Sequence, residues 1–109
     1  MKWRYRVKWD RIPDYMREGI AMYVEKGYRP GDFLLSILCN DLRGAAGHAD
    51  DTNRYLLYDY VAFFHAFAPS GCWGGPSTVH SWIKAGGLEG IETLARQEQE
   101  HGEVDAGAE

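Results

Sequence analysis

The chain has 109 residues, of which 45% are hydrophobic and 14% aromatic, so one packed globular domain is expected and a disordered chain is excluded. A formal net charge of −4 argues against extended tracking of a nucleic-acid backbone, and no run of 18 uncharged apolar residues indicates a membrane span. The start shows no secretory signal, and Cys39 and Cys72 lack metal-ligand spacing. We therefore expect a cytoplasmic protein with reduced thiols and no cofactor.

The first eleven residues are predicted to form an extended basic and aromatic arm. Rings and cations alternate along it with the period of a strand: Lys2, Trp3, Arg4, Tyr5, Arg6, Val7, Lys8 and Trp9. An isolated strand leaves its backbone groups unpaired, and no second strand is evident in the sequence. The arm must therefore pair with another strand or lie against another part of the molecule, and pairing with the same arm of a second copy would favour a two-fold dimer.

The rest of the chain is predicted to be all-α, a small bundle of four to five helices over residues 12–95. Apolar spacing, caps and glycine stops place helices at 12–26, 33–45, 53–68, 77–85 and 88–95. The segment 53–68 is apolar on almost every side, which predicts the central helix of the bundle. Residues 96–109 are acidic and predict a disordered tail.

Charge is divided between the two ends of the chain. Residues 1–11 carry five basic side chains against one acidic, whereas residues 89–109 carry seven acidic against one basic. This division predicts attraction between the ends, within one chain or between subunits, or else two separate contact surfaces.

Cations beside aromatic rings suit a ligand that has phosphates and a stackable base. Alternatively, the rings of the arm pack on the bundle and its cations face water. In the loop 72–75, consecutive glycines expose backbone N–H groups beside a tryptophan, or the tryptophan simply anchors a tight turn. The candidate ligand-binding residues are Arg4, Arg6, Lys8, Trp9, Arg43, Arg54 and Trp73.

Two further constellations are open alternatives. Asp41, His48 and Asp50 flank the predicted junction of the second and third helices and offer metal ligands, but they lack dedicated ligand spacing and a salt-bridged hairpin is the favoured explanation. Asp41 is unusual there, because a carboxylate near a helix C-terminus opposes the helix dipole. Cys72 or Ser70 with a histidine and an aspartate suggests a nucleophile, but no cysteine-enzyme or nucleophile-elbow signature is present, which favours a non-enzymatic function.

Several motifs of the chain are familiar as a set: IPDYM at 12–16, GYRPGDFL at 27–34, NDL at 40–42, AD..N at 49–53, APSGCWG at 68–74 and WIKAGG at 82–87. Over roughly residues 12–88 the chain resembles small uncharacterised proteins encoded by bacteriophages and prophages. The resemblance implies a protein of the host-cell cytoplasm that acts by stoichiometric binding to a host defence component or its nucleotide signal. It implies no catalytic residue.

We therefore expect a non-enzymatic binding protein, a homo-oligomer, that captures a nucleotide-like anionic ligand in counter-defence. One alternative is a protein–protein inhibitor of a host defence or regulatory protein that docks through its acidic tail or exposed aromatics. Another is a nucleic-acid-binding accessory protein whose basic arm enters a groove. A small hydrolase is a further alternative, and no membrane partner is expected.

Overall fold

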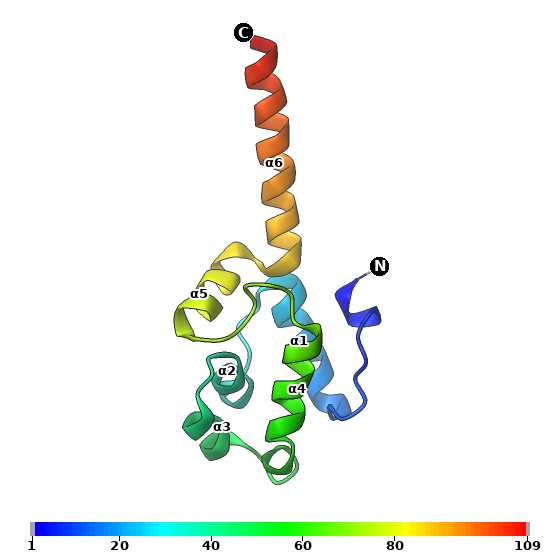
Figure 1. Cartoon of the computed structure of the whole chain (residues 1–109), viewed down its shortest axis with the longest axis vertical. Helices are drawn as coiled ribbons and strands as arrows, with labels where there is room; N and C mark the ends of the chain where they lie inside the picture. The colour runs from blue at the N-terminus through cyan, green and yellow to red at the C-terminus, as the bar shows by residue number, and fades with distance from the viewer. Residues whose placement is uncertain (1, 109) are drawn as a thin grey trace.

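The computed structural model describes residues 2–108 of the chain and the side chains of residues 2–99. The described residues contain no strand (Figure 1). They form six α-helices rather than four to five, and the all-α class is confirmed. The elements are η1 (Trp3–Tyr5), α1 (Asp14–Lys26), α2 (Asp32–Leu38), α3 (Leu42–His48), η2 (Asn53–Tyr55), α4 (Leu57–Phe67), α5 (Pro76–Ala85) and α6 (Gly87–Ala108), where η marks a 3₁₀ helix.

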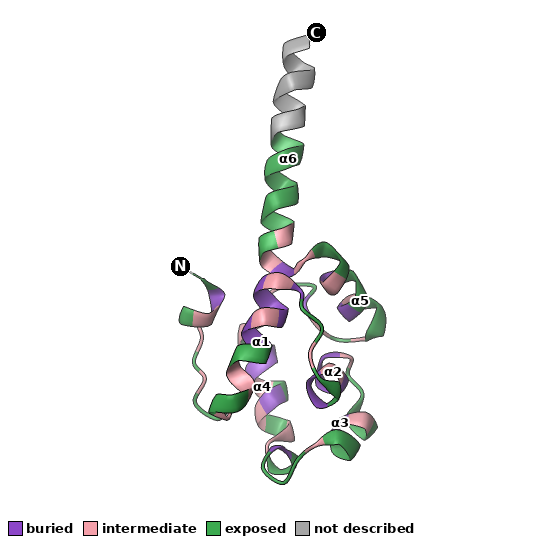
Figure 2. Cartoon of the chain, turned by 180° about the vertical axis from the view of Figure 1, so that it is seen from behind, coloured by how far each residue is buried: buried purple, intermediate pink, exposed green. Residues whose placement is uncertain are grey.

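The core lies between α1, α2, α4 and α5, whose inward faces are buried (Figure 2). Buried Tyr23 on α1 connects α1 to α5 and to the loop before α5. Its hydroxyl donates to the carbonyl of Cys72 at 2.6 Å, and its own carbonyl accepts from the indole N–H of Trp82 at 3.0 Å. These two hydrogen bonds hold the loop before α5, and α5 itself, against α1.

Two glycine positions seat α6 on the end of α1. Gly27 ends α1 in the left-handed conformation at φ 72°, as the sequence predicts. A Cβ on Gly27 would lie 2.8 Å from the backbone nitrogen of Gly87, and a Cβ on Gly87 would lie 2.6 Å from that of Gly27. The two backbones therefore meet at a distance that only glycine allows.

The single helix predicted over 33–45 is wrong, because the chain breaks into α2 and α3. Asn40 takes a left-handed conformation at φ 60°, which asparagine tolerates better than most residues. The side chain of Asp41 then accepts from the N–H of Gly44 at 2.9 Å and caps α3. Asp41 therefore lies at a helix N-terminus, where a carboxylate is favourable, and not at the C-terminus assumed from the sequence.

The helix predicted over 53–68 also differs from the structure. The chain forms η2 first, and α4 begins at Leu57. Tyr60, Phe63 and Phe64 are buried, but Tyr58 is 81% exposed. The helix is thus amphipathic rather than buried on all sides, because only one of its faces packs on the core.

Helix α6 runs past the predicted domain boundary at residue 96 and carries residues 96–108, where a disordered tail was expected. Its leucine, glutamate, glutamine, arginine and alanine residues favour helix without tertiary support. The helix projects from the body, so the molecule measures 62 × 27 × 19 Å (Figure 1). All residues from 91 to 99 are exposed (Figure 2).

Candidate functional site

The N-terminal arm folds onto the bundle and is not a strand. Trp3 is buried, and its indole N–H donates to the carbonyl of Phe67 at 2.9 Å. Trp9 stacks on Phe63 with 5.0 Å between ring centroids. Tyr5, which the alternation places beside these tryptophans, is exposed. The strand prediction is wrong because the 3₁₀ turn η1 brings Trp3 and Trp9 to the core. The inference that two arms pair as strands depended on that strand and is therefore wrong as well.

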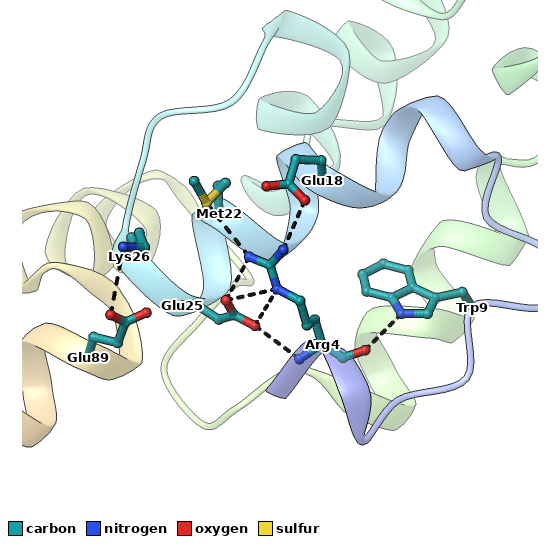
Figure 3. Close-up of polar contacts among 7 residues, drawn as sticks. All are labelled: Arg4, Trp9, Glu18, Met22, Glu25, Lys26 and Glu89. Carbon is teal, nitrogen blue, oxygen red and sulfur yellow. Dashed lines mark hydrogen bonds and ion pairs between the residues drawn. The ribbon is translucent and has the colours of Figure 1, made fainter. Parts of the chain in front are cut away.

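Arg4 binds two glutamates of α1 (Figure 3). Its guanidinium donates to Glu25 at 2.8 Å and to Glu18 at 2.9 Å, while its backbone N–H donates to Glu25 at 3.0 Å. The side chain of Glu25 is only 3% exposed. Burial by itself would raise the pKa of Glu25, but the hydrogen bonds from Arg4 outweigh it and leave that pKa lowered. Arg4 therefore neutralises a buried carboxylate.

The other predicted ligand contacts lie in different parts of the surface. Arg6, Lys8 and Arg43 are exposed. The guanidinium of Arg54 donates to the hydroxyl of Tyr55 at 2.8 Å, and half-buried Trp73 packs on Phe64 with 5.5 Å between ring centroids. Within the predicted set, the described contacts join only Arg4 and Trp9, whose indole N–H donates to the Arg4 carbonyl.

A pocket of about 310 Å³ opens between the first half of α1, the start of α2 and the connection from α3 to η2. Its apolar wall includes Met16, Phe33 and Leu34. Its polar lining comes from three separate segments of the chain: Tyr15, Asp32, His48, Asp50 and Asn53.

Tyr15 and Asp50 form the polar rim of this pocket. The Tyr15 hydroxyl donates to Asp50 Oδ2 at 2.6 Å, and Asp50 Oδ1 accepts from the backbone N–H groups of Thr52 at 3.1 Å and Asn53 at 2.6 Å. The hydrogen bond from Tyr15, followed by the backbone bonds, lowers the pKa of Asp50, and the same hydrogen bond raises the pKa of Tyr15. At neutral pH the rim therefore holds a carboxylate and a protonated phenol.

Asn53 fixes the floor of the pocket. It is 2% exposed, and its Oδ1 accepts from the hydroxyl of buried Tyr60 at 2.6 Å. The sequence analysis grouped His48 and Asp50 but missed Tyr15 and Asp32. One sequence signal could have indicated Tyr15: its position in α1 is next to the row of apolar residues that face the core and not within that row.

The metal and nucleophile alternatives find no support in the described residues. No group of three His, Cys, Asp or Glu residues within the described part of the chain could hold a metal, and Asp41 instead caps α3. Cys72 is fully buried, and burial raises the pKa of its thiol to about 12. The nucleophile hypothesis is therefore wrong for Cys72, because its thiol stays protonated at neutral pH and fills the core.

Within the described residues, no helix combines the length and apolar character needed to cross a bilayer. Comparisons with known protein families, with characterised proteins and with solved structures find no match.

Proposed function

We propose that this protein is a non-enzymatic binding protein that captures a small amine-bearing ligand in the pocket between α1, α2 and η2. The observation that carries the proposal is the ionised Asp50, held by Tyr15 and two backbone N–H groups at the rim of an apolar cavity. A carboxylate fixed in this way loses little freedom when it accepts a charge-assisted hydrogen bond from an ammonium group.

The charge of the pocket supports a cationic ligand. Asp32 and Asp50 line it, and its described lining contains no lysine or arginine. The aromatic side chains of Tyr15 and Phe33 also line the pocket, and aromatic rings favour a cation over an anion. A phosphate in this pocket would meet two carboxylates and no lysine or arginine, which is unfavourable.

The size and walls of the pocket support a small ligand with an apolar part. Its volume of about 310 Å³ lies at the lower end of the roughly 300–1,000 Å³ of ligand pockets. Met16, Phe33 and Leu34 would cover the apolar part while the carboxylates bind the amine.

The proposal is tested with three probes that share a phenyl ring and a short chain but differ in charge: phenethylamine, 2-phenylethanol and hydrocinnamate. Calorimetry and thermal shift should show the amine binding more tightly than the alcohol, and the acid not binding. Tyr15→Phe and Asp32→Asn should each weaken amine binding, whereas Tyr28→Phe and Asp51→Asn, at exposed positions outside the pocket, should leave it unchanged. Equal binding of all three probes, or a preference for the acid, contradicts the proposal.

A second candidate function is the capture of a nucleotide-like anion in a counter-defence role. A cleft of about 210 Å³ brings the cations Lys8 and Arg11 together with the ring of Phe67, which supports a phosphate next to a base, although Asp10 and Asp59 also line it. Arg11 is partly neutralised by Asp59 at 3.5 Å, so Lys8 would supply most of the free charge. A nucleotide panel tests this candidate: Lys8→Glu should abolish any thermal shift by nucleotides and leave amine binding intact. A nucleotide shift that survives Lys8→Glu rules out the cleft.

A further inference from the structure

Among the side chains that the structure describes, those that attach helix α6 to the body lie at its base. Its first residue packs on Gly27, and Glu89 pairs with Lys26 at 3.8 Å. Beyond that point Ile91 and Leu94 are 41% and 55% exposed. Three residues apart on a helix, these two side chains share one face and form a short apolar strip that is open to a second molecule.

The helix is also strongly acidic. Residues 89–108 carry six acidic side chains against Arg96. Glu92 and Glu98 are exposed and form no ion pair with another described residue. A molecule that covers this helix must therefore present positive charge.

The complementary surface lies on the same chain, in the arm. Lys2 and Arg6 are exposed, form no ion pair with the described residues and flank η1, where Tyr5 is 70% exposed. The arm lies at the same end of α1 as the base of α6, since Arg4 binds Glu25 while the adjacent Lys26 binds Glu89 (Figure 3). Because α6 projects away from this end, Glu92 and Glu98 form no ion pair with the described arm of their own chain.

We propose that a second copy of the chain covers α6: two copies pair antiparallel about a two-fold axis, and the acidic α6 of each lies against the basic arm of the other. An antiparallel arrangement brings Glu92 and Glu98 of one chain alongside the base of the partner's α6, which is where the partner's arm lies. The two-fold axis makes the same favourable contact twice. A parallel pair would instead leave Glu92 and Glu98 of each chain away from the partner's arm.

The geometry also sets the expected strength of the dimer. A helix of 22 residues is about 33 Å long and, with side chains, about 10 Å across. Two reciprocal contacts of that size bury less than the roughly 800 Å² per partner of a standard interface. We therefore expect a weak dimer that dissociates on dilution and in high salt, because its charges are at the surface.

A charge-swap experiment tests the pairing. The helix variant carries Glu92→Lys and Glu98→Lys, and the arm variant carries Lys2→Glu and Arg6→Glu. Each variant alone places like charges in both contacts and should sediment as a monomer at concentrations where the unaltered protein forms a dimer. An equimolar mixture restores opposite charges in both contacts, so it should form a heterodimer that 0.5 M NaCl dissociates.

A control variant with Arg43→Glu and Asp51→Lys reverses two exposed charges outside both surfaces and should dimerise as the unaltered protein does. Circular dichroism should show that all variants melt within a few degrees of one another, because every altered side chain is exposed. A protein that stays monomeric at all concentrations overturns the proposal. A dimer that is insensitive to the swaps, or variants that fail to pair when mixed, overturns it as well.

Discussion

The two charged ends of this chain differ in how they contact the body of the molecule. The basic arm folds onto the body through the buried indole of Trp3 and the ion pairs of Arg4 with Glu18 and Glu25. The acidic helix α6 leaves the body after its first turn. Both ends are rich in charge, so charge by itself does not decide whether a terminal segment docks.

The difference lies in the residues that neighbour the charged side chains. Arg4 follows a tryptophan that fills the core, and it faces a glutamate on the buried side of α1. The burial of the ring provides the stabilisation that orders the arm, and the ion pair avoids an isolated buried charge. Glu92 and Glu98 have no such neighbours among the described residues.

Removing the anchor charge of the arm should have the largest effect. Arg4→Ala leaves Glu25 buried without its partner, which should lower the free energy of unfolding by about 3 kcal/mol. Arg6→Ala, at an exposed neighbouring position, should change it by less than about 0.5 kcal/mol. Urea denaturation of both variants measures the difference. Similar midpoints for the two variants would show that the arm is held without the ion pair.

Lowering the pH should weaken the attachment of the arm, because Glu25 then becomes protonated. The folded-state pKa of Glu25 lies below its ordinary value of 4.5. Its contribution to stability is therefore fully present above about pH 4.5 and is lost as the pH falls through the folded-state value. The difference in unfolding free energy between the unaltered protein and Glu25→Gln should be constant near neutral pH and shrink below pH 4.5. A difference that grows on acidification contradicts the assignment.

Shortening α6 should have the smallest effect on the fold. Deleting residues 96–109 removes no described core contact, because residues 91–99 are already exposed. The unfolding free energy of the monomer should change by less than about 0.5 kcal/mol. Denaturation in 0.5 M NaCl, where the proposed dimer is dissociated, isolates this quantity. A loss of several kcal/mol would show that the outer turns of α6 support the body.

Local signals in the sequence were sufficient for much of the helical framework. The end of α1 at Gly27 and the stop of α5 at Gly86 follow from residues within one turn of each boundary. The break at Asn40 and Asp41 was missed, although both residues carry turn and cap signals, because the apolar stripe over 33–45 continues through them. The pocket was predicted only in part, because Tyr15 lies on α1, far along the chain from the pocket's other polar residues.

The sequence by itself determined the helical class, the ends of α1 and α5 and the opposite charges of the two ends, because these depend on neighbouring residues and on composition. Only the tertiary structure decided which charged side chains form ion pairs within the molecule and where a pocket forms. Trp3 meets Phe67 across 64 residues, Tyr15 meets Asp50 across 35, and Arg4 meets Glu25 across 21. Such contacts depend on how the helices pack, and no periodicity within one segment encodes which distant residue a side chain will face.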